Sequence, residues 1–177
     1  MHSILRKPIY ITLLGILLYC PPSLAQGSLQ AERAGFHFQI ALGWGVGPDS
    51  NGLFQNMEIG GTFENGWTLA YNHVFIQNKG FAQPEGGPDL VGGHLLLLKI
   101  PATDHWVLKI GAGPGGIHIQ DDGIEAEIGL GVTYGVDYHI LITPSSGITF
   151  GLTGLHALIS RRRHFFGAAL SLGYTWF

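Results

Sequence analysis

The sequence predicts an all-β fold, an eight-stranded antiparallel up-and-down transmembrane β-barrel, and three observations carry this prediction. Apolar residues alternate with small or polar ones over long stretches. Charged residues make up only 12% of the chain, whereas glycine is abundant with 28 residues. The connections between the alternating stretches are in turn longer and shorter. Period-two alternation in long segments of low charge is typical of strands that face lipid on one side.

Residues 1–25 have the layout of a secretory signal peptide. Arg6 and Lys7 precede the apolar run 9–19, and small residues lead to an expected cleavage site near Ala25. The run is too short for a membrane-spanning helix, which needs about 20 apolar residues.

The chain after the signal peptide is expected to be a short leader, 26–33, followed by the barrel, 34–177. The one cysteine, Cys20, falls within the signal peptide, so no disulfide is expected, and Tyr19 before it argues against lipidation. Without the signal peptide, seven basic residues stand against twelve acidic ones, a net charge of −5. This balance argues against nucleic acid as a partner.

The alternation gives each strand an apolar face and a small or polar face. In 35–46, phenylalanine, isoleucine, leucine, tryptophan and valine occupy the even positions, and in 124–138 the same pattern persists for fifteen residues. The expected strands are 34–46, 53–64, 67–77, 89–100, 105–114, 124–142, 148–159 and 165–177.

The connections fall into two sets, which places consecutive strands antiparallel. Asn65-Gly66 is a strong hairpin signal. The short turns are expected at 64–66, 101–104 and 143–147, and the longer loops at 47–52, 78–88, 115–123 and around 161–164. Two strands fit the alternation poorly. Segment 94–98 is apolar on both faces, and a shift of phase in the seventh strand suggests a β-bulge at Gly154.

The apolar face is expected to meet lipid, because a face of glycine and threonine suits a narrow barrel interior better than a solvated surface. The large aromatic residues near the strand ends are then predicted to form girdles at the two membrane–water interfaces. These residues are Trp44, Trp67, Trp106, Tyr138, Tyr174 and Trp176.

The chain resembles the small eight-stranded outer-membrane barrels of the OmpA/OmpX type. The shared features are the signal peptide, the eight alternating strands, the alternation of short turns with longer loops, and the terminal aromatic residue. The resemblance implies a bacterial, Gram-negative outer membrane, both chain ends in the periplasm, and a final aromatic, here Phe177, that serves as an assembly signal for the barrel-assembly machinery. One departure is that the apolar row of the last strand runs through Tyr174 and Trp176, one residue out of phase with Phe177.

Charged residues on the predicted inner face are expected to pair as a polar network that plugs the lumen, because a lone buried ion is very costly. The alternative is a permeable interior. The network residues are Glu58, Lys99, Lys109, Glu125 and Glu127. In a predicted external loop, the basic cluster Arg161, Arg162 and Arg163 is a candidate contact for lipopolysaccharide phosphates, with a solvated loop as the alternative.

Motifs for other chemistry are weak. The glycine pattern at 111–116 resembles a dinucleotide-binding loop, but strand-like alternation follows it where a helix is required. His118 near Asp121 and Asp122 is a marginal metal candidate, and neither metal nor cofactor is expected. His156 and Ser160 are weak candidates for an acyl hydrolase, since their spacing departs from the lipid A deacylase pattern.

A protease-like pair of Asp137 and His139 is less favoured still, because the pair is expected near the periplasmic turn, away from an external substrate.

The sequence therefore predicts a non-enzymatic, monomeric integral outer-membrane protein with a structural or surface-loop interaction role, in contact with outer-membrane lipid and lipopolysaccharide. The alternatives are a narrow pore or carrier for small solutes and a lipid A-modifying acyl hydrolase.

Overall fold

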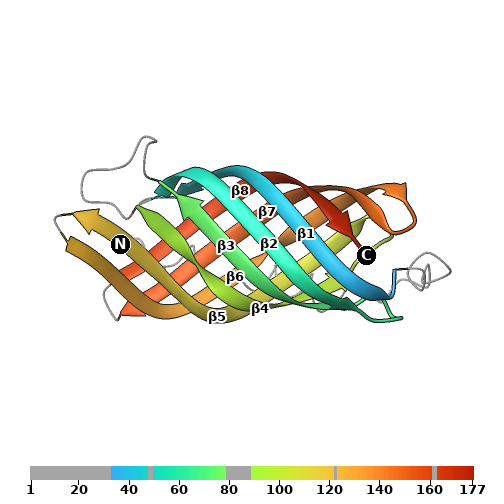
Figure 1. Cartoon of the computed structure of the whole chain (residues 1–177), viewed down its shortest axis with the longest axis horizontal. Helices are drawn as coiled ribbons and strands as arrows, with labels where there is room; N and C mark the ends of the chain where they lie inside the picture. Colours follow the sequence, from blue (N-terminus) through green and yellow to red (C-terminus); the bar gives the residue numbers. More distant parts are fainter. Residues whose placement is uncertain (1–32, 48–49, 79–88, 122, 161–162) are drawn as a thin grey trace, which may run out of the picture.

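The computed structural model describes residues 33–47, 50–78, 89–121, 123–160 and 163–177. These residues form eight strands that pair antiparallel in sequence order and close on themselves through β1 and β8, so the predicted barrel is confirmed (Figure 1). The strands are β1 (Gly35–Gly47), β2 (Ser50–Thr62), β3 (Thr68–Gln77), β4 (Leu90–Pro101), β5 (Trp106–Asp121), β6 (Gly123–Thr143), β7 (Ser146–Ser160) and β8 (Arg163–Trp176).

Short turns connect β2 to β3, β4 to β5 and β6 to β7, and the start of β1 and the end of β8 lie at the same end of the barrel (Figure 1). Gly66, in the first of these turns, has a φ of 79°, a left-handed conformation that glycine adopts without steric cost. We call this the turn end and the other the loop end. The predicted signal peptide and leader lie outside the described residues, apart from Arg33.

Alternation determines which side chains face inward. In β3 the even residues from Thr68 to Ile76 are buried in the lumen, while Leu69 and Tyr71 are exposed on the outer face. The same division holds around the barrel, and 25 large apolar side chains of the described residues remain exposed, most of them on that outer face. A surface of this kind is stable in contact with lipid.

The lumen has two layers of different chemistry. Toward the loop end it holds an apolar core, and toward the turn end it is polar. Buried members of the apolar layer include Phe54, Val74, Ile76, Val91, Leu95, Ile117 and Leu155.

This layering explains segment 94–98, which is apolar on both faces. Leu95 and Leu97 are each 1% exposed inside the lumen, whereas Leu96 is 61% exposed on the outer face. The side chains of this segment therefore alternate between lumen and outer face, and both faces are apolar because the inner one lines the apolar layer.

The predicted β-bulge at Gly154 is also wrong. β7 pairs with β6 and β8 without interruption through Gly154, and its irregularities lie near its two ends instead. Leu155 and Ala157 are inward-facing residues of the apolar layer, so the phase never shifts. The change from polar to apolar lumen produced the apparent slip.

The predicted loop 115–123 is largely strand. β5 continues past Pro114 to Asp121 and pairs with β6 over that whole length. Pro114 lacks a backbone N–H, and the pairing of β5 with β4 is interrupted beside it, between Gly93 and Leu96. The glycine-rich segment thus continues a strand despite its turn-like composition.

Candidate functional site

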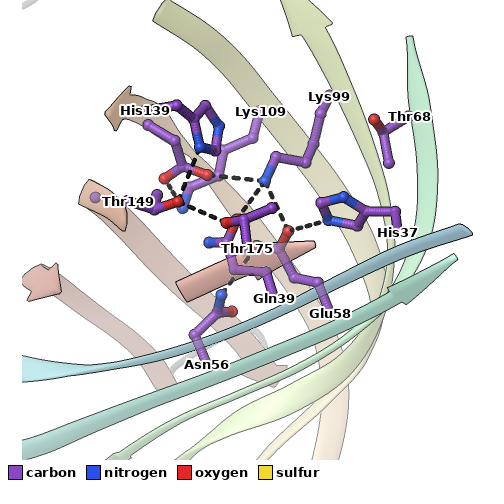
Figure 2. Close-up of polar contacts among 12 residues, drawn as sticks. His37, Gln39, Asn56, Glu58, Thr68, Lys99, Lys109, His139, Thr149 and Thr175 are labelled. Carbon is purple, nitrogen blue, oxygen red and sulfur yellow. Dashed lines mark hydrogen bonds and ion pairs between the residues drawn. The ribbon is translucent and has the colours of Figure 1, made fainter. Parts of the chain in front are cut away.

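Four charged side chains from four strands meet in the polar layer of the lumen, and we call Glu58, Lys99, Lys109 and Asp137 the charge network. Figure 2 labels Glu58, Lys99 and Lys109 among the polar side chains around them. Lys99 Nζ lies 2.8 Å from Glu58 Oε2 and 3.0 Å from Asp137 Oδ2. Lys109 Nζ lies 2.6 Å from Asp137 Oδ1. All four residues are at most 6% exposed.

The charge network is electrically balanced, with two ammonium groups against two carboxylates. Burial of either sign alone would be costly, because an ion loses its hydration and gains nothing in return. Here each charge has an opposite charge within 3.0 Å. The arrangement ties β2, β4, β5 and β6 together across the lumen.

Neutral polar groups complete the hydrogen bonding around the charges. Gln39 Oε1 accepts from Lys99 Nζ at 2.8 Å and from Thr175 Oγ1 at 3.0 Å, and both residues are buried. His37 Nε2 lies 3.2 Å from Glu58 Oε2. The layer therefore extends to β1 and β8, the two strands that close the barrel. Further members are Asn56, Asn72, His139 and Thr149.

An aromatic ring covers this layer at the turn end. The Phe177 ring lies 5.3 Å from the His139 ring and 6.2 Å from the His37 ring, both inside the lumen. The Arg33 guanidinium carbon lies over the same ring, 4.9 Å from its centre. The Phe177 N–H donates to the Ser145 carbonyl at 2.9 Å. Phe177 thus follows the inward-facing phase.

The structure brings together three of the five predicted network residues, Glu58, Lys99 and Lys109. Glu127 lies on β6 ten residues before Asp137 and pairs in register with Ile117, so it belongs to the loop end and away from the other three. Glu125 is paired in β6 with Ile119, but its side chain lies outside the description.

Asp137 is the important residue that the network prediction missed. From the sequence alone it is a candidate only with His139, in the protease-like pair. Both side chains are buried in the lumen, where Asp137 binds two lysines and His139 Nδ1 lies 2.8 Å from Thr149 Oγ1. Asp137 shares the inner face of its strand with Glu125 and Glu127, and this alternation could have identified it as a member of the network.

The predicted girdle residues lie on the outer face near the strand ends. Five are at or near the turn end, where Trp106 packs against Tyr138 and Trp176 against Tyr174, with ring centres 4.8 and 4.3 Å apart. Trp67 is the fifth, immediately before β3, whereas Trp44 lies toward the loop end of β1, where its Nε1 donates to Asn51 Oδ1 at 2.9 Å.

The remaining candidates are only partly placed. Arg161 and Arg162 lie outside the described residues, and Arg163 begins β8 without a described side chain. His156 lies on the outer face of β7, with its ring 6.1 Å from that of His164. The Ser160 side chain likewise lies outside the description.

Neither a membrane-spanning helix nor a metal-binding cluster occurs among the described residues. They contain no helix that is long and apolar enough to cross a membrane. They also bring no three histidine, cysteine, aspartate or glutamate side chains into an arrangement that would hold a metal ion. The side chains of His118, Asp121 and Asp122, the marginal metal candidate, are outside the description.

The fold is similar to that of small outer-membrane barrels. Neisserial surface protein A matches with a TM-score of 0.52 and 18% identity, over 81% of this chain and 97% of that one. The Yersinia pestis outer membrane protein Ail in a phospholipid bilayer nanodisc matches with a TM-score of 0.51 and 14% identity, over 80% and 99%. No family model and no curated protein matches the sequence.

Proposed function

We propose that this chain is an integral outer-membrane protein with a non-conducting barrel and a non-enzymatic role, either structural or in presenting its external loops. The similarity to two outer-membrane barrels supports the location. The apolar outer face supports it independently, because the exposed side chains of that face would be unfavourable in water. On this reading the turn end faces the periplasm.

The observation that carries the proposal is the occupied lumen. The charge network and its hydrogen-bonded neighbours reach from β1 around to β8, and each of its four charged groups is at most 6% exposed. A second, apolar layer fills the lumen toward the loop end. A hydrated path through the barrel would require both layers to separate, which argues against the narrow pore.

Planar bilayer recording tests the closed lumen. We expect wild-type protein refolded into lipid to give no discrete current steps at neutral pH. The comparison is a variant in which Lys99→Ser and Glu58→Ser remove one ion pair together and so leave the remaining charges balanced. Regular single-channel steps from the folded wild-type protein would overturn the proposal and favour the solute pore.

Mass spectrometry of lipid A tests the enzymatic alternative. Gram-negative cells that express the chain are compared with empty-vector cells, after fractionation has located the protein in the outer membrane. We expect unchanged lipid A, because the His156 ring lies on the outer face against the rings of His164 and Phe166. Loss of an acyl chain that is abolished by His156→Ala would instead establish an acyl hydrolase.

A further inference from the structure

Three polar rings form a cluster on the outer face of the barrel, where apolar residues are the rule. His73 of β3 pairs in register with His94 of β4, and their ring centres are 4.7 Å apart. The Tyr71 hydroxyl is hydrogen-bonded to His94 Nδ1, and the two rings stack with centres 5.8 Å apart. Tyr71 and His94 are both exposed. We call these three residues the ring cluster.

The ring cluster lies deep in the apolar band rather than at its border. His73 follows the girdle residue Trp67 by six positions along β3. At about 3.3 Å per residue and a strand tilt of about 40°, six residues span about 15 Å along the barrel axis. The apolar band is about 25 Å tall, so His73 lies near its middle. Ionisable groups at this depth are costly and usually mark a functional surface.

A shallow hollow adjoins the ring cluster on the same outer surface. It has a volume of about 200 Å³, and His94 forms part of its wall. Small residues of β4 and β5 line the hollow: Gly92 and Gly116 pair in register and carry no side chains, and the Phe75 ring lies against Gly92. Phe75 and Ile128 border it, and Ile128 is 78% exposed.

We propose that the outer face of β3, β4 and β5 is an interface between two copies of this chain, in which the ring clusters of both copies meet across a two-fold axis. This departs from the monomer expected from the sequence, and it rests on the proposed membrane location. A two-fold interface uses one patch on both subunits, so the patch must complement itself. Rings that project beside a hollow meet this requirement, because each copy can insert its rings into the other's hollow.

The chemistry of the rings favours a second copy over lipid as the occupant. A neutral imidazole has one nitrogen that donates and one that accepts, so two histidine clusters can bond to each other. Acyl chains at this depth offer neither donor nor acceptor. Small residues at the contact also let two backbones approach closely, as they do where helices associate in membranes.

Disulfide cross-linking tests this interface in outer-membrane vesicles. In a Cys20→Ser background, Leu96→Cys places a thiol beside the ring cluster, since Leu96 pairs with Tyr71 and is 61% exposed. The matched control is Leu170→Cys on β8, which is 69% exposed and six residues before the girdle residue Trp176, hence at similar depth. We expect oxidation to yield at least five-fold more dimer from L96C than from L170C.

A second pair of substitutions ties the dimer to the rings themselves. Adding His73→Phe and His94→Phe to L96C should lower the dimer yield at least three-fold, while urea unfolding stays normal because phenylalanine suits a lipid-facing position. Equal dimer yields at both cysteines, or a yield that the phenylalanines leave unchanged, would overturn the interface. Absence of the protein from the outer-membrane fraction would instead count against the proposed location.

Native mass spectrometry of the wild-type protein, released gently into detergent, is the independent check. A dimer that the two phenylalanine substitutions convert to monomer supports the interface. A monomer that retains a bound lipid, lost in the same variant, would show that lipid occupies this surface and would overturn the proposal.

Discussion

Lys99 on β4 reaches past β5 to Asp137 on β6, with 3.0 Å between Nζ and Oδ2, while the same Nζ lies 2.8 Å from Glu58 on β2. One ammonium group therefore balances carboxylates from two parts of the wall. Replacing it with the similarly long but neutral methionine leaves two carboxylates with Lys109 alone. We expect Lys99→Met to lower the free energy of unfolding by about 3–5 kcal/mol, measured by urea unfolding in lipid vesicles with tryptophan fluorescence.

The control for this prediction restores the charge balance. Adding Glu58→Gln to Lys99→Met leaves one lysine and one carboxylate, so the double variant should recover much of the lost stability. Glu64→Gln, in the exposed turn between β2 and β3, should change nothing. If Glu58→Gln lowered the free energy of unfolding of the Lys99→Met variant further, instead of raising it, the charges would not act as a network.

The phase of the strands could be predicted from the sequence, whereas contacts across the lumen could not. Alternation alone places Glu58, Lys99 and Lys109 on the inner face, because side chains in a strand point to opposite sides in turn. Which of them meet depends on the register of all eight strands and on how far the closing strands are offset. Asp137 pairs in register with Val107, so its contact with Lys109 is diagonal and no local spacing reveals it.

The errors of prediction share a physical cause. Alternation predicts small or polar residues on the inner face, so the apolar Leu155 there suggests a β-bulge at Gly154, whereas in the structure Leu155 fills the apolar layer. Likewise the glycines that follow Pro114 predict a loop from residue 115, yet the strand continues there, and only its pairing with β4 is interrupted beside Pro114. Tertiary packing overrides local turn propensity at such positions.

Two neighbouring leucines in β4 test the layered lumen directly. Leu95 is 1% exposed within the apolar layer, and Leu96 is 61% exposed on the outer face. Leu95→Ala should cost about 2–5 kcal/mol, because it removes buried methyl groups and leaves a cavity. Leu96→Ala should cost less, since lipid fills the space. Unfolding midpoints in urea compare the two variants, and equal losses would contradict the assignment of the faces.

Glycines on the inner face provide room that a larger residue would take away. A Cβ atom at Gly115 would lie 2.5 Å from the Gly131 Cα, which is backbone and cannot move aside easily. We expect Gly115→Ala to destabilise the barrel by about 1–3 kcal/mol through overpacking. Gly61→Ala is the matched control, because its Cβ would meet nothing closer than the Gly35 carbonyl oxygen at 3.5 Å. Equal stability of the two variants in thermal unfolding would refute this packing argument.

Substitutions of Phe177 test whether its aromatic ring stabilises the turn end of the barrel. The ring contacts His139 and His37 inside the lumen and the Arg33 guanidinium at the mouth. Phe177→Leu keeps an apolar side chain but loses the ring contacts, so the free energy of unfolding should fall by about 1–2 kcal/mol. Phe177→Tyr keeps the ring and should retain most of the stability. Urea unfolding of protein refolded in vitro separates this effect from cellular assembly, and similar losses in both variants would show that the ring itself contributes nothing.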